Sequence, residues 1–187
     1  MDSGNIGFVL LCAAFVFVMT PGLAMFYGGL VRKKNVVNTM MTSIFIIGVG
    51  IVMWVLFGYS LSFAPSGNAF IGDFRWLGLE GVSLTEGYTD DASIPNMVFS
   101  AFQMMFAVIT PALITGAVAG RMKFKSIFVF TIFWSLIVYY PLAHMVWGQG
   151  GLLGADGIGA LDFAGGDVVH ISSGVSALVL CILLGKR

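Results

Sequence analysis

The segment PGLAMFYGGLVRKKNVVNTMMTSIFIIGVGIVMW, residues 21–54, decides the fold class. Two long apolar stretches meet there at three consecutive basic residues, Arg32, Lys33 and Lys34. About 20 apolar residues cross the hydrocarbon core of a bilayer, and Lys and Arg mark loops on the cytoplasmic side. The segment therefore predicts two membrane-spanning helices that are joined by a short cytoplasmic turn.

The same pattern continues along the chain. Of its 187 residues, 58% are hydrophobic and 10% are charged, and the mean hydropathy is +0.97. Soluble domains carry about 25% charged residues, so lipid must cover much of this chain. The first apolar stretch has no basic segment before it and is too long for a signal peptide, so it is interpreted as a mature span. We expect an all-α polytopic membrane protein with five transmembrane helices, at approximately 6–31, 36–63, 94–120, 126–147 and 168–185.

The charged residues separate into two sets along the chain. Three segments without any acidic residue carry eight of the nine basic ones: Arg32, Lys33, Lys34, Arg121, Lys123, Lys125, Lys186 and Arg187. The N-terminus and the other loops hold Arg75 and all nine acidic residues: Asp2, Asp73, Glu80, Glu86, Asp90, Asp91, Asp156, Asp162 and Asp167. Such alternation requires an odd number of crossings. It predicts an N-terminus outside the cell and a cytoplasmic C-terminus for this chain.

Several classes of function are disfavoured. No basic patch with interleaved aromatic residues is present, which argues against nucleic-acid binding. The sequence has no nucleophile–base motif, so neither an enzyme nor a cofactor is expected. Cys12 and Cys181 lie inside apolar stretches and are interpreted as small buried hydrophobes.

His170 is the first candidate functional residue, because it lies inside the apolar stretch of the fifth span. Ionisable side chains within spans are rare and suggest function by default. We expect His170 to be buried and neutral. A neutral imidazole both donates and accepts a hydrogen bond, which suits a small polar permeant or a proton relay. An interhelical hydrogen bond with a structural role is the alternative.

His144 and Asp162 favour structural interpretations. His144 lies near the outer end of the fourth span, and Asp162 lies in a glycine-rich turn before the fifth. An aspartate there caps a helix or holds a turn, although a negative charge at a mouth also attracts cations. A metal site of His144, Asp162, Asp167 and His170 is conceivable, but no HExxH or paired-cysteine motif supports it.

Aromatic residues near the outer boundary form a second candidate site. Phe102 and Phe106 are four residues apart and share a helix face, and Trp147 lies at the outer end of the fourth span. Aromatic faces attract cations. The chain has 17 phenylalanines, however, and Trp is common at membrane interfaces. Ordinary packing without cation binding is therefore the alternative interpretation of these residues.

Glycines and prolines predict how the helices pack. Gly116 and Gly120 form a GxxxG pair that lets two helices approach closely. Gly48 and Gly50 reduce the side-chain volume of the second span and allow the same kind of approach there. Ordinary membrane-helix composition is an alternative for the second span. Proline removes a backbone donor, so a kink is expected at Pro21, Pro111 and Pro141.

Four segments together resemble the ammonium transporter (Amt/Mep/Rh) family. They are PGLAMFYGGLVRKKNVVN at 21–38, FQMMFAVIT at 102–110, AHMVWG at 143–148 and ALDFAGGDVVHI at 160–171. They occur in family order over nearly the whole chain, and together they are highly specific.

The resemblance implies a fold of eleven spans built from two five-helix inverted repeats, assembled as a homotrimer with one pore per subunit. The five spans of this chain match the first repeat. The resemblance also implies an outer site that recruits ammonium at Phe102, Phe106 and Trp147, with Asp162 as a structural residue below it. It implies that His170 is the first of two pore histidines. Ammonium would lose a proton, ammonia would pass a hydrophobic pore, and the proton would return along the histidines.

The chain departs from the family pattern in two ways. Gly120 stands where the family usually has an acidic residue before Arg121. The second repeat and the C-terminal tail are absent, so we expect a portion of a longer transporter that is inactive in isolation. The absent tail leaves open whether a small trimeric nitrogen-signalling protein, often met at the family's cytoplasmic face, is a partner. A sensor on the same fold and a non-transporting fragment are the alternatives.

The charge pattern makes a prediction about topology. Single cysteines at Ser66 and Asn35, in a background without Cys12 and Cys181, should differ in labelling by an impermeant thiol reagent on intact cells. We expect labelling at 66 only, because the positive-inside rule places 35 in the cytoplasm. Labelling at 35 instead would reverse the predicted orientation.

Overall fold

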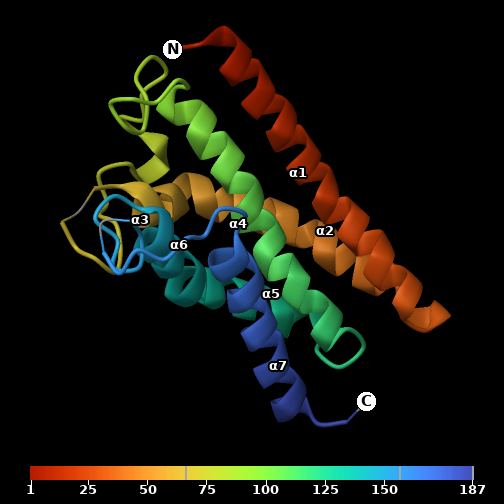
Figure 1. The fold of residues 1–187 in the computed structure, drawn as a ribbon. Coiled ribbons are helices and arrows are strands. Elements are labelled where there is room, and N and C mark those ends of the chain that lie inside the picture. Colours follow the sequence, from red (N-terminus) through yellow and green to blue (C-terminus); the bar gives the residue numbers. More distant parts are fainter. Residues whose placement is uncertain (66, 156, 187) are drawn as a thin grey trace.

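The protein is a bundle of five long helical segments, and the described residues contain no strand (Figure 1). The computed structural model describes residues 1–65, 67–155 and 157–186. Ser66, used in the topology prediction, and Asp156 and Arg187, used in the charge pattern, lie outside the described residues. Each of the five segments is long and apolar enough to cross a membrane, which confirms the predicted fold class. The first segment is α1 (Ser3–Leu30), and the second joins η1 (Lys33–Asn35), α2 (Val36–Met53), η2 (Trp54–Gly58) and α3 (Tyr59–Phe63). The third is α4 (Asn96–Val118). The fourth joins α5 (Phe124–Trp134), η4 (Ser135–Tyr139) and α6 (Tyr140–Trp147), and the fifth joins η5 (Gly166–Ile171) and α7 (Ser172–Leu184).

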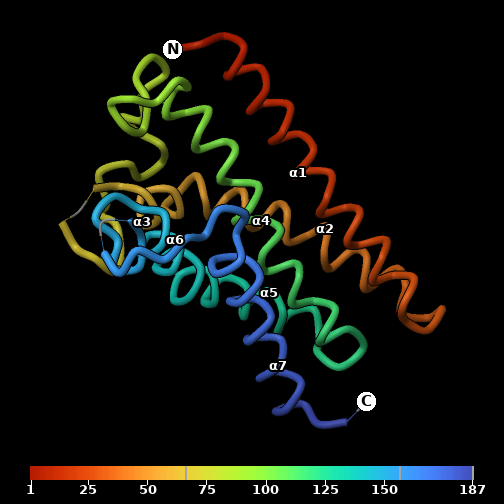
Figure 2. Tube along the Cα trace, viewed as in Figure 1, coloured from red at the N-terminus to blue at the C-terminus, as the bar shows by residue number. Residues whose placement is uncertain are grey.

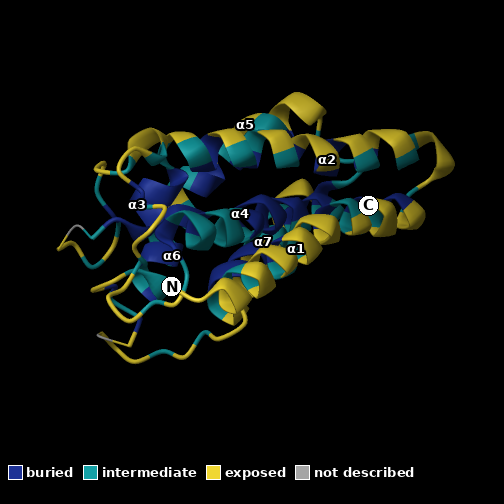
Figure 3. Ribbon diagram, turned by 90° about the horizontal axis from the view of Figure 1, so that it is seen from above, coloured by how far each residue is buried: buried dark blue, intermediate teal, exposed yellow. Residues whose placement is uncertain are grey.

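α4 is the central helix, and α1, α2 and α7 pack against it. Buried residues occur along its whole length, whereas α1 is largely exposed (Figure 3). Polar contacts tie the neighbours to α4: the Tyr27 hydroxyl donates to the Leu113 carbonyl over 2.9 Å, and the hydroxyls of Ser43 and Thr115 lie 3.0 Å apart. Interhelical hydrogen bonds of this kind contribute roughly 1 kcal/mol each in a membrane.

The connections gather at two opposite ends of the bundle (Figure 2). The long-loop end holds the N-terminus and residues 64–65, 67–95, 148–155 and 157–165, and the basic end holds the turns after α1 and α4 and the end of α7. The charges that alternate along the sequence are therefore separated in space. Among the described residues the only ion pair is Arg75 with Asp73, 2.8 Å apart, at the long-loop end. At the basic end Asn35 is half-buried and Lys34 is exposed, so Lys34 is the more accessible labelling position.

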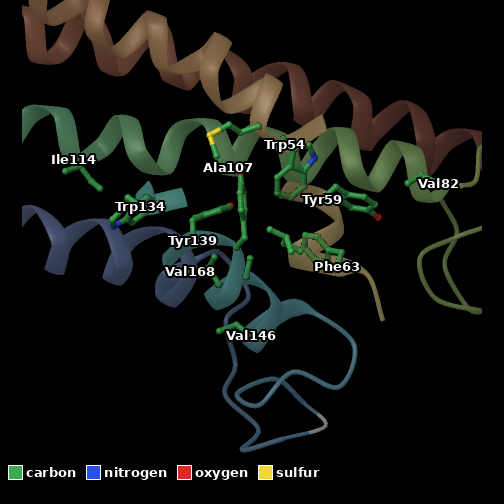
Figure 4. Close-up of a cluster of buried hydrophobic side chains, with 14 residues drawn as sticks. Trp54, Tyr59, Phe63, Val82, Ala107, Ile114, Trp134, Tyr139, Val146 and Val168 are labelled. Carbon is green, nitrogen blue, oxygen red and sulfur yellow. The ribbon is translucent and has the colours of Figure 1, made fainter. Parts of the chain in front are cut away.

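Three of the five spans contain a π-helical turn, a feature that the sequence pattern does not reveal. The turns are η2, η4 and η5. Residues in or next to them, including Trp54, Tyr59, Tyr139 and Val168, form the main buried cluster against α4 (Figure 4). π turns are rare and are frequent at functional sites.

The prolines behave differently from one another. α1 and α4 continue through Pro21 and Pro111 as single helices. Pro141 lies two residues after η4, and because proline lacks a backbone N–H, it cannot close an α-helical bond there. Near Pro141 the departure from the α-helix is the π turn η4. The helices α1 and α4 are not interrupted at Pro21 and Pro111.

The glycines divide into those that allow close packing and those that do not. A Cβ at Gly116 would lie 2.6 Å from the Tyr27 ring, and one at Gly50 would lie 3.0 Å from a side chain of α4. A Cβ at Gly48 would meet nothing within 4 Å. Gly120 lies beyond the end of α4 with a φ of +72°. The GxxxG interpretation of Gly116 and Gly120 is therefore wrong, because Gly120 forms a turn instead of a helix contact.

This difference predicts the effect of added methyl groups. Gly116→Ala should lower the free energy of unfolding by about 1–3 kcal/mol, the usual cost of overpacking, because the Tyr27 ring must move. Gly48→Ala, the control, meets no neighbour and should leave it unchanged or raise it by up to about 1 kcal/mol, since alanine favours a helix over glycine. Thermal unfolding in detergent of the protein encoded by its natural gene is the measurement, and equal melting temperatures for both variants would contradict the packing at Gly116.

Candidate functional site

A cavity of about 590 Å³ opens at the long-loop end, between α4, α6 and the segment that precedes η5. The Phe102 and Phe106 rings lie edge to face with centroids 5.1 Å apart, and the Phe106 and Trp147 centroids are 6.4 Å apart. Asp162 reaches the same cavity, so four of the five residues predicted for the site lie together. The full lining is Tyr88, Phe99, Phe102, Gln103, Phe106, Trp147, Asp162, Phe163, Ala164 and Gly165.

Asp162 organises the start of the fifth span. Its Oδ1 accepts a hydrogen bond from the Gly166 N–H over 2.6 Å, and its Oδ2 accepts from the N–H groups of Asp167 and Val168, both over 3.0 Å. The first N–H groups of a helix have no partner within the helix, and a carboxylate there also interacts favourably with the helix dipole. The side chain therefore acts as the cap of η5, and both of its oxygens are occupied.

The Asp162 backbone fixes one wall of the cavity. The Trp147 indole N–H donates to the Asp162 carbonyl oxygen over 3.1 Å. This bond holds the indole, at the end of α6, against the segment before η5. One residue thus positions both the last span and the ring that closes the cavity beside Phe106.

The opposite wall is formed by Tyr88 from the long loop. Its ring stacks on Phe99 with centroids 4.9 Å apart and an angle of 7° between the planes. Burial raises the pKa of Tyr88 to about 12, an effect opposed by the hydrogen bond from the Gln149 backbone N–H. The hydroxyl is therefore neutral at physiological pH, and this wall adds no charge.

Sequence reasoning missed six residues of the lining: Tyr88, Phe99, Gln103, Phe163, Ala164 and Gly165. Phe99, Phe102, Gln103 and Phe106 follow the spacing of one helix face, so the period of α4 contained the signal for two of them. Tyr88 and Phe163 come from loops, where no periodicity predicts which side chain turns inward.

The cavity has the chemistry of a weak cation site. Its aromatic rings present negative faces, and no lysine or arginine among the described residues lines it. A cation over such a ring gains about 0.5–1 kcal/mol when exposed and about 2 kcal/mol when desolvated. An arrangement of this kind can attract a small cation.

The structure does not place His170 where the sequence suggested. The expectation that it is buried is wrong for this chain, because the side chain is exposed and does not line the aromatic cavity. η5 turns its neighbours Val168 and Val169 into the core instead. His170 lies beside an uncovered apolar face of the last span that includes Ile171, Val175, Leu178 and Ile182.

His144 is the histidine that the fold buries completely. Its Nδ1 lies 3.1 Å from the Ser62 carbonyl oxygen and its Nε2 lies 2.8 Å from that of Asn68. These contacts tie α6 to the end of α3 and to the loop that follows it. No group of three metal-ligating side chains occurs in residues 1–65, 67–155 and 157–186, and both His144 and Asp162 are engaged elsewhere.

Comparisons with known proteins agree with this architecture. The model of the Ammonium Transporter Family matches residues 7–187. The ammonium transporter of Bacillus subtilis (strain 168) is 54% identical over 187 residues, which are 100% of this chain and 45% of that protein. Candida albicans Mep2 in its crystal structure is 34% identical with a TM-score of 0.88, over 100% of this chain and 40% of that one. A Sensor Amt Protein is 27% identical with a TM-score of 0.82, over 98% and 44%.

The Asp162 cap predicts a specific loss of stability. Asp162→Asn keeps one acceptor oxygen and turns an NH₂ group toward backbone donors, so we expect the free energy of unfolding to fall by about 1.5–3 kcal/mol. Thermal unfolding of the protein encoded by its natural gene measures this. Asp167→Asn removes a neighbouring charge whose carboxylate accepts none of these bonds, and it should change the stability little. A similar loss in both variants would show that charge, and not capping, is responsible.

Proposed function

Because this chain belongs to the ammonium transporter family, we propose that it forms part of a protein that carries ammonium across a membrane. The chain spans about half the length of the curated relatives that it matches. The observation that supports the proposal within the chain is the aromatic cavity at the long-loop end. Its rings offer a small cation a binding place without any basic residue to repel it.

Recruitment is the first step of the proposed mechanism. Ammonium enters the cavity from outside the cell and lies against the faces of Phe102, Phe106 and Trp147. The Asp162 carboxylate acts through the fold, because its oxygens are held by η5. The proposed orientation places the long-loop end outside and the basic end in the cytoplasm, as the positive-inside rule requires.

Passage is the second step. The permeant passes its proton to the His170 imidazole and continues as ammonia along the uncovered face of the last span. His170 is exposed in η5, next to Ile171 of that face. Its imidazole guides the permeant and returns the proton, since a neutral ring both donates and accepts a hydrogen bond.

The uncovered face needs a partner in the membrane. Leu178 and Ile182 are 61% and 70% exposed, and His170 lies beside the same face. We propose that a second five-helix repeat covers this face and completes the pore, and that three such units assemble as a homotrimer. The basic end, which has no acidic residue in its sequence segments, is the proposed docking face for a small trimeric nitrogen-signalling protein.

Sensing is the second candidate function, because a Sensor Amt Protein shares the fold with a TM-score of 0.82. The Mep2 structures are closer in both identity and TM-score. Transport is therefore the preferred proposal, and a protein that binds ammonium but carries no current would favour sensing.

The proposed role of His170 is tested by replacing its ring. His170→Leu is similar in volume, has no titratable atom and should assemble normally, yet we expect it to lose most of the ammonium-evoked current in reconstituted membranes. His170→Glu restores a titratable group and should recover part of the current. Currents are compared at equal amounts of assembled protein encoded by the natural gene. Wild-type current from an assembled leucine variant would remove His170 from the conduction path.

A further inference from the structure

Gln103 is the polar residue that α4 places in the aromatic cavity. It lies between Phe102 and Phe106 in sequence and shares the cavity-facing side of the helix with Phe99. Its side-chain carbonyl oxygen is buried and has no hydrogen-bond partner among the described residues. Buried polar groups are nearly always hydrogen-bonded, so an unpaired acceptor at the wall of a binding cavity indicates a ligand that donates.

The other polar side chains of the cavity are already in use. Both Asp162 oxygens accept backbone N–H groups, the Trp147 indole N–H is bound to a carbonyl, and the Tyr88 hydroxyl accepts from the Gln149 backbone. Gln103 is thus the polar lining side chain whose buried acceptor has no hydrogen-bond partner within the described part of the chain. The last torsion of glutamine is broad and roughly two-fold, so the amide oxygen and nitrogen can exchange places by a rotation about it, and the proposal requires the orientation in which the oxygen faces the cavity.

Aromatic faces alone do not explain selection of one cation over another. A ring attracts any cation over its face, whether or not that cation carries N–H groups. A carbonyl oxygen is directional and rewards a ligand that donates a hydrogen bond. A site built to hydrogen-bond its ligand discriminates strongly against an analogue that lacks the donor, because the buried acceptor is then left unpaired.

We propose that Gln103 is a specificity-determining residue of the cavity: its amide oxygen accepts a hydrogen bond from bound ammonium and favours cations that carry N–H groups over quaternary ammonium ions. This inference rests on the proposed function, since it assigns the ligand of the same cavity. Phe102, Phe106 and Trp147 then supply the attraction for charge, and Gln103 supplies the preference for a hydrogen-bond donor.

The test compares ammonium with tetramethylammonium, a cation without N–H groups. It uses the protein encoded by its natural gene in reconstituted membranes. The half-saturating ammonium concentration of the current is measured, together with the tetramethylammonium concentration that halves this current. Gln103→Met keeps the length and loses the acceptor. It should raise the half-saturating ammonium concentration by roughly ten-fold to a hundred-fold, the value of a hydrogen bond to a charged group, and change inhibition by tetramethylammonium less than about two-fold.

Two control variants separate the acceptor from the rings and from the loop. Trp147→Leu removes a ring, so it should weaken ammonium and tetramethylammonium together. Gln149→Met alters the chain's other glutamine, which lies outside the cavity lining, and should change neither concentration beyond about two-fold, because only its side-chain bond to the Tyr88 carbonyl is lost.

The outcomes distinguish this inference from the proposed function. Absence of any ammonium current in the wild-type protein overturns the proposed function. A wild-type current with an unchanged half-saturating concentration in Gln103→Met, or an equal loss for both cations, overturns the inference alone. If the methionine variant does not assemble, Gln103→Glu is the deciding variant. A carboxylate acceptor should lower the half-saturating ammonium concentration, and an unchanged concentration overturns the inference.

Discussion

Backbone N–H and C=O groups find no water in the hydrocarbon interior, and this constraint shapes every part of the chain. Helices satisfy it within each span, so five helices account for nearly all of the apolar sequence. Where the helical pattern stops, side chains supply the missing partners. The Asp162 carboxylate accepts the first N–H groups of η5, and the His144 ring lies against one carbonyl at the end of α3 and one in the loop after it. The long stretches of irregular backbone lie at the long-loop end, and only short turns lie at the basic end.

The candidate site arises at such a break. The chain leaves α6 at Trp147 and enters η5 at Gly166, and the intervening segment turns back over the face of α4 that carries Phe102, Gln103 and Phe106. An aromatic face that would otherwise contact lipid becomes the wall of a cavity. Residues in or next to the three π turns form the main buried cluster, and Tyr88, Phe99 and Trp147 of the cavity wall pack against that cluster.

The distribution of exposure separates two functions of the surface. α1 is exposed along most of its length, as expected for a helix that meets lipid or another subunit. The exposed face of α7 differs, because the polar residue His170 adjoins it. An ionisable group on an otherwise apolar membrane face is costly when it meets lipid. We therefore infer that this face meets protein or a water-filled space instead of lipid. Such surroundings are those of the pore that we propose beside His170.

The sequence by itself determined the all-α class, the five spans and the separation of charges, because apolar length and the placement of Lys and Arg are one-dimensional properties. It also pointed to Phe102, Phe106, Trp147 and Asp162 through local motifs. It could not determine the exposure of His170 or the burial of His144, since both depend on which side of a helix meets a neighbour. The π turns, the non-helical position of Gly120 and the unpaired oxygen of Gln103 likewise required the tertiary structure. Each results from contacts between segments distant in the chain, and residue order alone does not encode those contacts in a local pattern.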